Sequence, residues 1–133
     1  MRSFLISLVC GALCATSVAG QNVLCTLESG GQGFISPVIL FTLPRAEARS
    51  ASVYDSVIDA VHGVPIAARV KSRGKDVLRY EWRVNGIPAR PTKASVGYWA
   101  DLNIKKNTVR ISGSIRGFDN DIKGKGRCEQ REN

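Results

Sequence analysis

A chain of 133 residues is long enough for a single domain. It carries 19 Lys and Arg against 11 Asp and Glu, a formal net charge of +8. Such a charge allows adhesion to acidic surfaces such as lipids, cell-wall polymers or nucleic acid, and the alternative interpretation is that it serves solubility alone. Beyond residue 20, no apolar stretch approaches the roughly 20 residues that a membrane-spanning helix requires, so the sequence predicts no such span there.

The first twenty residues differ from the rest and have the layout of a secretory signal peptide. An early arginine precedes an apolar segment over residues 4–15, and small residues follow it. Cleavage after Ala19 and cleavage after Gly20 both fit this pattern. We therefore expect residues 1–20 to be removed and residues 21–133 to form one β-domain that is periplasmic or secreted.

Two cysteines remain after that cleavage, Cys25 and Cys128, together with 18 Lys and Arg against 11 Asp and Glu, a net charge of +7. In an oxidising compartment an isolated pair is best interpreted as one disulfide. It would close a loop of roughly 100 residues, for which the chain-entropy model gives about 4.7 kcal/mol of stabilisation. With His62 as the only histidine, the ligands for zinc are too few, and we expect no metal or cofactor.

Apolar and polar residues alternate with period two along much of this domain, which predicts β-strands. The clearest strands cover residues 77–84, 95–104 and 108–115, and less regular ones cover 23–27, 35–43, 51–54, 66–70 and 122–128. A helical turn is expected over residues 56–62. Turn residues separate these segments, and Asn85-Gly86 is expected to begin a longer loop.

Short strands joined by such turns predict an all-β fold, an antiparallel meander of about seven or eight strands forming a small barrel or sandwich. The expected disulfide joins the first strand to the last, which are the two edges that a meander leaves. Closure would remove both edges.

The apolar pattern also predicts how the clearest strands pair. Four apolar pairs share a buried face if residues 77–84 and 95–104 are antiparallel with partner numbers that sum to 180. These pairs are Leu78 with Leu102, Tyr80 with Ala100, Trp82 with Tyr98, and Val84 with Val96. The same register places Arg79 opposite Asp101 and Glu81 opposite Trp99 on the outside. A slip of two residues keeps the same faces and is the open alternative. The next hairpin, turning at Lys106-Asn107, is expected to pair Leu102 with Ile111 and Ile104 with Val109.

Several residues suggest chemistry in isolation but are better explained by structure. His62 has acidic neighbours, but no serine or cysteine nucleophile signature accompanies it. Glu81 and Asp101 are expected to belong to a solvated row of charges rather than to a glycosidase pair. The acidic run at residues 119–121 lacks the further ligands of a calcium loop. We expect no catalytic residues.

Positive charge is concentrated toward the C-terminus. This basic group comprises Arg116, Lys123, Lys125, Arg127 and Arg131. It is a candidate contact for an anionic surface. The alternative interpretation is an edge strand that lysines protect from aggregation.

The mature chain resembles a group of small exported bacterial proteins of uncharacterised function. The resemblance rests on Cys25 with Gly30-Gly31, Val53 with Asp55, Gly63 with Pro65-Ile66, Tyr80 with Trp82, the stretch Gly117-Phe118-Asp119-Asn120, and the alternation Gly124, Gly126, Cys128. It implies a bacterial, exported context. A looser likeness to small-barrel periplasmic lysozyme inhibitors rests on size and on the placement of the terminal cysteines, without their inhibitory motif.

The sequence therefore predicts an exported, non-enzymatic binding domain acting at the bacterial cell envelope. Its expected partner is an anionic envelope component or a secreted protein, with no specific nucleic acid, and the domain is expected to be a monomer. One alternative is a protein inhibitor of a wall-degrading enzyme such as lysozyme. A small hydrolase is the second alternative.

Overall fold

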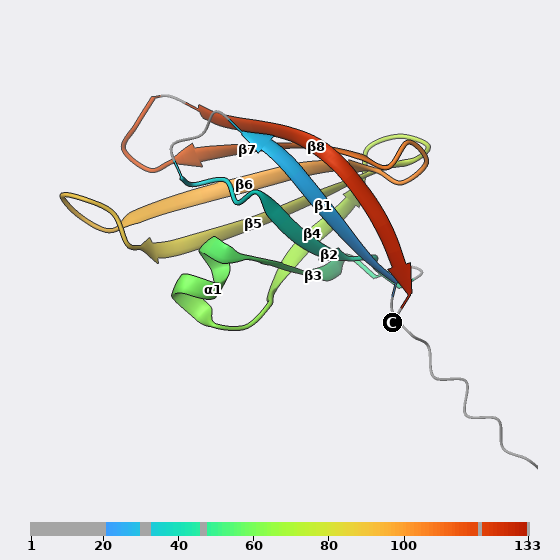
Figure 1. Cartoon of the computed structure of the whole chain (residues 1–133), viewed down its shortest axis with the longest axis horizontal. Coiled ribbons are helices and arrows are strands. Elements are labelled where there is room, and N and C mark those ends of the chain that lie inside the picture. Colours follow the sequence, from blue (N-terminus) through green and yellow to red (C-terminus); the bar gives the residue numbers. More distant parts are fainter. Residues whose placement is uncertain (1–20, 30–32, 46–47, 120, 133) are drawn as a thin grey trace, which may run out of the picture.

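The structure, a computed structural model, describes residues 21–29, 33–45, 48–119 and 121–132. The expected signal peptide, residues 1–20, lies outside this part. Within it, eight antiparallel strands close into a barrel in sequence order (Figure 1). The strands are β1 (Gln21–Ser29), β2 (Val38–Thr42), β3 (Ser50–Asp55), β4 (Ile66–Ser72), β5 (Val77–Ile87), β6 (Ala94–Asn103), β7 (Thr108–Ile115) and β8 (Asp121–Glu132). The predicted all-β meander is confirmed, and the structure selects the barrel over the sandwich.

The register predicted for β5 and β6 is confirmed at all four apolar pairs, including Trp82 with Tyr98. These side chains form the interior, where Trp82 stacks on Tyr98 with ring centroids 5.3 Å apart. The ring of Phe41 on β2 lies with its centroid 4.8 Å from that of Tyr80 and 6.0 Å from that of Trp82, with which it forms a T-shaped pair. The aromatic residues of three strands therefore meet in one core, as the period-two pattern requires.

The register predicted for β6 and β7 is wrong by two residues. Leu102 pairs with Val109, not with Ile111, and Ile104 lies in the turn. The Asn103 side chain accepts hydrogen bonds from the backbone N–H groups of Lys105 and Lys106, at 3.2 and 2.9 Å. Because this asparagine organises a four-residue connection that ends at Asn107, with φ 54°, the two-residue turn does not form.

Asn85 and Gly86 do not begin a loop, in contrast to the prediction. They lie within β5, where the pairing with β6 shifts between Val84 and Ile87. Gly86 has φ 74°, a conformation that glycine adopts without strain. The dipeptide therefore forms a β-bulge, and the connection to β6 starts after Ile87.

Strands β1 and β8 close the barrel, and they run side by side in Figure 1. They pair over nine residues, with Cys25 directly opposite Cys128. The predicted disulfide joins these two residues. The backbones approach closely at Gly126, where a Cβ atom would lie 2.0 Å from the carbonyl oxygen of Thr26. Glycine is therefore required where β8 bends against β1.

One helix, α1 (Ser56–His62), follows β3 and packs against β5 and β3. Asp55 caps it by accepting a hydrogen bond from the Ile58 N–H at 2.8 Å, and Ile58 is fully buried. The predicted helical turn is thus confirmed as a short helix. Within the described part of the chain, no helix has the length and apolar character needed to cross a membrane.

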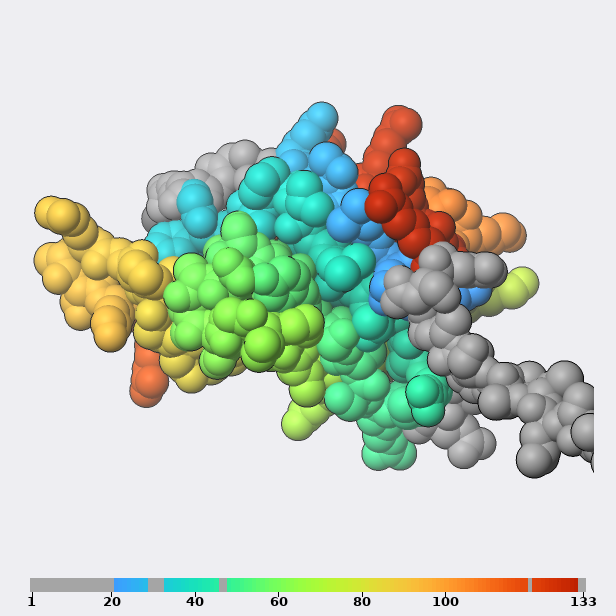
Figure 2. Space-filling view, turned by 60° about the horizontal axis from the view of Figure 1, so that its bottom comes forward, coloured from blue at the N-terminus to red at the C-terminus, as the bar shows by residue number. Residues whose placement is uncertain are grey.

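Three connections meet at one end of the barrel. They are the end of the β1–β2 connection, the β5–β6 loop and the β7–β8 loop. The β5–β6 loop (yellow) protrudes beyond α1 (green) at this end of the molecule (Figure 2). Side chains from segments far apart in sequence gather here and line the pocket described below.

Candidate functional site

Strand β8 carries the centre of the basic group that the sequence predicts. Its buried residues Ile122 and Cys128 alternate with Lys123, Lys125 and Arg127, all of which are exposed. Alternation in a strand sends successive side chains to opposite faces. The three cations therefore lie in one outward row.

A fourth cation lies on the neighbouring strand. Arg110 of β7 is directly opposite Lys125 and is also exposed, whereas Glu28 of β1 lies opposite Lys125 on the other side. We call Arg110, Lys123, Lys125 and Arg127 the β8 basic face. No ion pair joins any of the four to a described carboxylate. The face therefore carries four formal positive charges. Its acidic neighbours are Glu28 on β1, Asp101 opposite Arg110 on β6, and Asp121 and Glu129, which flank the row along β8.

The other two members of the predicted group lie elsewhere. Arg131 is near the end of β8, exposed, and forms an ion pair of 3.2 Å with Glu129. Arg116 follows β7 and lies at the rim of the concavity described next. The structure thus brings three of the five predicted residues into one row. Because β8 also pairs with β1, it is not the free edge strand of the alternative interpretation.

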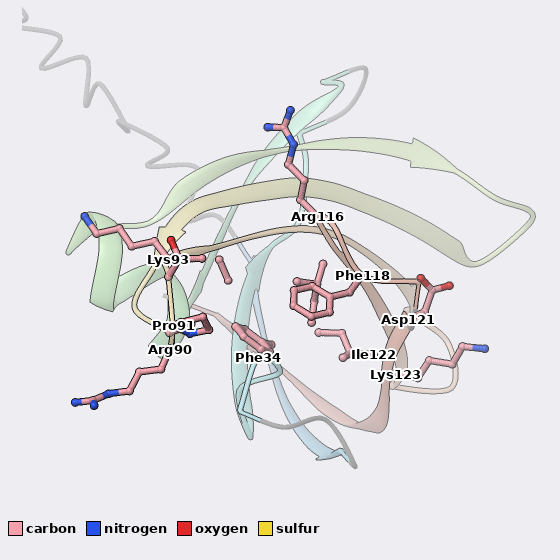
Figure 3. Close-up of a pocket in the computed structure, with 13 residues that line it drawn as sticks. Phe34, Arg90, Pro91, Lys93, Arg116, Phe118, Asp121, Ile122 and Lys123 are labelled. Atoms are coloured by element: carbon pink, nitrogen blue, oxygen red, sulfur yellow. The ribbon is translucent and has the colours of Figure 1, made fainter.

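A pocket of about 570 Å³ opens at the barrel end where the three connections meet. We call it the end pocket. Its apolar wall includes Phe34, Pro91, Phe118 and Ile122, and Figure 3 shows the rings of Phe34 and Phe118 near its centre together with Ile122. Phe118 is 68% exposed, the highest fraction among the large exposed hydrophobic residues of the described chain. An apolar concavity of this size falls in the range of about 300–1,000 Å³ typical of small-molecule sites.

Charged residues surround this apolar wall. Arg90, Lys93, Arg116 and Lys123 line the end pocket, with Asp121 as the acidic lining residue. The charged ends of the four cations point outward from the pocket centre (Figure 3). No ion pair joins these cations to a described carboxylate. The end pocket therefore combines an apolar floor with a basic rim.

The sequence pattern did not predict this pocket. Its lining residues come from positions 34, 89–94 and 115–123, which only the barrel topology brings together. The sequence feature that could have indicated an apolar surface site is Phe118. It is an aromatic residue within a polar turn, where it does not belong to the period-two pattern of the core.

His62 is exposed at the end of α1, and its acidic neighbours have other structural roles. Asp59 accepts a hydrogen bond from the Tyr54 hydroxyl, and Asp55 caps the helix. Burial raises the pKa of Asp55 above its ordinary value, although hydrogen bonds to its carboxylate oppose this. Neither carboxylate hydrogen-bonds His62, so the described residues contain no aligned acid–histidine pair here.

Glu81 and Asp101 lie outside the barrel, as their predicted register requires. Asp101 accepts two hydrogen bonds from Arg79, at 2.7 and 2.8 Å, and Lys71 lies 2.9 Å from Glu81. These bonds are the main reason that the pKa of each carboxyl lies below its ordinary value. A general acid requires a raised pKa, so the environment of this pair suits a charge ladder rather than glycoside hydrolysis.

In the acidic run at residues 119–121, Asp119 and Asp121 flank Asn120, which lies outside the described residues. Among the residues that the structure describes, no group of three or more His, Cys, Asp or Glu side chains is arranged to hold a metal ion.

Comparison with known proteins adds no relative. No protein-family model matches the chain, and searches of curated proteins and of solved structures return no significant match. Function is therefore argued from the two features above, the β8 basic face and the end pocket.

Proposed function

We propose that this protein is an exported, non-enzymatic binding domain that attaches to an anionic component of the bacterial cell envelope through its β8 basic face. The observation that carries the proposal is the outward row of Lys123, Lys125 and Arg127, extended by Arg110 on β7. A regular row of exposed cations suits a polymer or surface that presents repeated negative charges.

Three observations support the envelope as the place of action. The disulfide between Cys25 and Cys128 is typical of proteins that fold in oxidising compartments. The first twenty residues have the pattern of a signal peptide. The resemblance to small exported bacterial proteins agrees with both.

Binding by this face is expected to be electrostatic and of modest specificity. Its cations are exposed and held on a regular strand, so they contact charged groups without deep burial. Interactions between exposed charges weaken as salt rises, because the screening length falls to about 8 Å at physiological ionic strength. Affinity for one partner would then come from several simultaneous contacts rather than from a single strong one.

The test compares two variants of equal net charge. In the first, Lys123, Lys125 and Arg127 are changed to Gln; in the control, the exposed residues Arg45, Arg49 and Arg69 are changed to Gln. Binding to a linear polyphosphate and to vesicles that contain phosphatidylglycerol is measured at low salt. We expect the first variant to lose most binding and the control to retain it.

Equal reductions of binding in the two variants would show that net charge alone attracts the polymer and would contradict a defined face. Unchanged binding in the first variant would mean that its charges serve solubility. Capture of partners from the native envelope by the wild-type protein, followed by mass spectrometry, then identifies the anionic component.

A further inference from the structure

We propose that the end pocket binds the alkyl chain of an amphiphile whose anionic head rests among the rim cations. This inference concerns a different ligand and, apart from Lys123, different residues from those of the β8 basic face. Two properties of the pocket define the ligand: its apolar wall and the positive charge of the side chains at its rim.

The apolar wall is exposed at Phe118, half-buried at Phe34 and buried at Ile122. Phe118 is 68% exposed, and Phe34 and Ile122 lie beside it in the same pocket (Figure 3). Covering this surface with an alkyl chain removes apolar area from water, which is the main favourable term for such ligands.

The wall is also held in place by the barrel. The carbonyl oxygen of Phe34 accepts a hydrogen bond of 2.6 Å from the hydroxyl of Tyr98, a residue of the buried aromatic core. On the other side of the pocket, the Phe118 N–H donates to the Ile115 carbonyl at 3.1 Å, and the Arg116 N–H donates to the Ser95 carbonyl at 2.9 Å. The pocket is therefore formed before a ligand enters, which lowers the entropic cost of binding.

The charge expected for the head group follows from the charges of the side chains at the rim of the pocket. Arg90, Lys93, Arg116 and Lys123 outnumber the acidic lining residue, Asp121. Because these side chains fan outward from the apolar centre, a head group left at the mouth would lie among them while the chain points inward. A carboxylate or phosphate head satisfies this arrangement, whereas an ammonium head would be repelled.

The experiment measures binding of hexanoate, octanoate and decanoate by calorimetry, each below the concentration at which it forms micelles. Complete burial of one methylene group raises affinity about four-fold. Each acid in the series is two methylenes longer than the one before, so its affinity should be higher by up to about fifteen-fold. Decylammonium has the same chain and the opposite charge, and it should bind at least about ten-fold more weakly than decanoate.

Two variants locate the site. Phe118→Ser should weaken decanoate binding about ten-fold, whereas Val64→Ser, an exposed apolar residue outside the pocket at 59% exposure, should leave it unchanged. The double variant Lys93→Gln and Arg116→Gln should reduce the preference of decanoate over decylammonium. Lys123 is kept in these variants because it also belongs to the β8 basic face.

Vesicles that contain phosphatidylglycerol distinguish the source of the ligand. If Phe118→Ser weakens vesicle binding as well as decanoate binding, bilayer lipids supply the chain; if only decanoate is affected, the ligand is a free amphiphile. The proposal is overturned if decanoate does not bind, if chain length has no effect, or if Phe118→Ser and Val64→Ser behave alike. Polyphosphate binding should stay unchanged in the pocket variants. A failure of the pocket proposal can therefore be distinguished from a failure of the proposed function of the β8 basic face.

Discussion

Trp82 is the residue whose environment best represents the interior of this barrel. It is 6% exposed, stacks on Tyr98 and forms a T-shaped pair with Phe41. Tyr98 and Tyr80 are buried as well, and their hydroxyls donate hydrogen bonds to backbone carbonyl oxygens at 2.6 and 2.8 Å. The aromatic core thus combines apolar contact with satisfied tyrosine hydroxyls.

Replacing Trp82 with Ala should lower the free energy of unfolding by about 3–5 kcal/mol, because it removes a large buried side chain and leaves a cavity. Urea denaturation measures this decrease. Trp99 lies on the same sheet but faces outward, opposite Glu81, so Trp99→Ala should cost only about 1 kcal/mol. Similar decreases for the two variants would contradict the assignment of faces.

The pair formed by Arg79 and Asp101 has good geometry but lies on the outside of the barrel. A double-mutant cycle should give a coupling energy of about 1 kcal/mol at most at neutral pH, since solvent screens exposed pairs. Arg79 lowers the pKa of Asp101, so the coupling is present above the unfolded-state pKa of about 4 and disappears as pH falls through the folded-state value. A coupling that stays constant down to pH 2 would contradict this assignment.

At the scale of strands and turns, the hydrophobic pattern predicts faces better than it predicts connections. Alternation excluded a one-residue slip between β5 and β6, because such a slip would turn apolar side chains toward solvent, and the predicted register is the observed one. A two-residue slip keeps the faces, and this error occurred between β6 and β7. There the hydrogen bonds of the Asn103 side chain determine the register, and alternation carries no information about them.

The contact of β8 with β1 gives a sharp test at the same scale. A Cβ atom at Gly126 would lie 2.0 Å from the backbone oxygen of Thr26, which cannot move without separating the strands. Gly126→Ala should therefore cost about 3 kcal/mol or more of stability. At Gly124 the nearest atom is a side-chain methyl group of Ile111 at 3.2 Å, so Gly124→Ala should cost only about 1 kcal/mol. Thermal unfolding of both variants measures which substitution destabilises more. A Gly126→Ala protein of wild-type stability would contradict the close approach of β8 to β1.

The end pocket shows a second reason why prediction from the sequence was incomplete. Phe34 and Phe118 are 84 positions apart, and no local pattern links them. Their meeting follows from the order of strands around the barrel and from which loops share an end. Arg116 and Lys123 are recognisable in the sequence as basic residues, but nothing local assigns both to the rim of one apolar pocket.

At the scale of the whole molecule, closure is the dominant feature. The β1–β8 pairing joins the two ends of the domain, and the disulfide links residues 103 positions apart across that seam. Changing both Cys25 and Cys128 to Ser should lower the free energy of unfolding by about 2–5 kcal/mol, because the unfolded chain without the cross-link has higher conformational entropy. Peptide mapping without reductant should show the linked pair in the wild type, and two free thiols there would contradict the assignment.

Positive charge is the other feature of the whole molecule. The net charge of +7 expected for residues 21–133 is spread over several faces, but on β8 three cations form a regular outward row, which Asp121 and Glu129 bound along the strand. The proposed function depends on this arrangement rather than on the total charge.

The salt dependence of polyphosphate binding tests this claim most directly. The logarithm of the affinity should fall linearly with the logarithm of the salt concentration, as counterions are released from the polymer. In the variant with Gln at Lys123, Lys125 and Arg127, the slope should be shallower by about three, because each cation that meets a phosphate adds about one to it. The control variant at Arg45, Arg49 and Arg69 should keep the wild-type slope. Equal slopes in all three proteins would contradict a binding role for the β8 basic face.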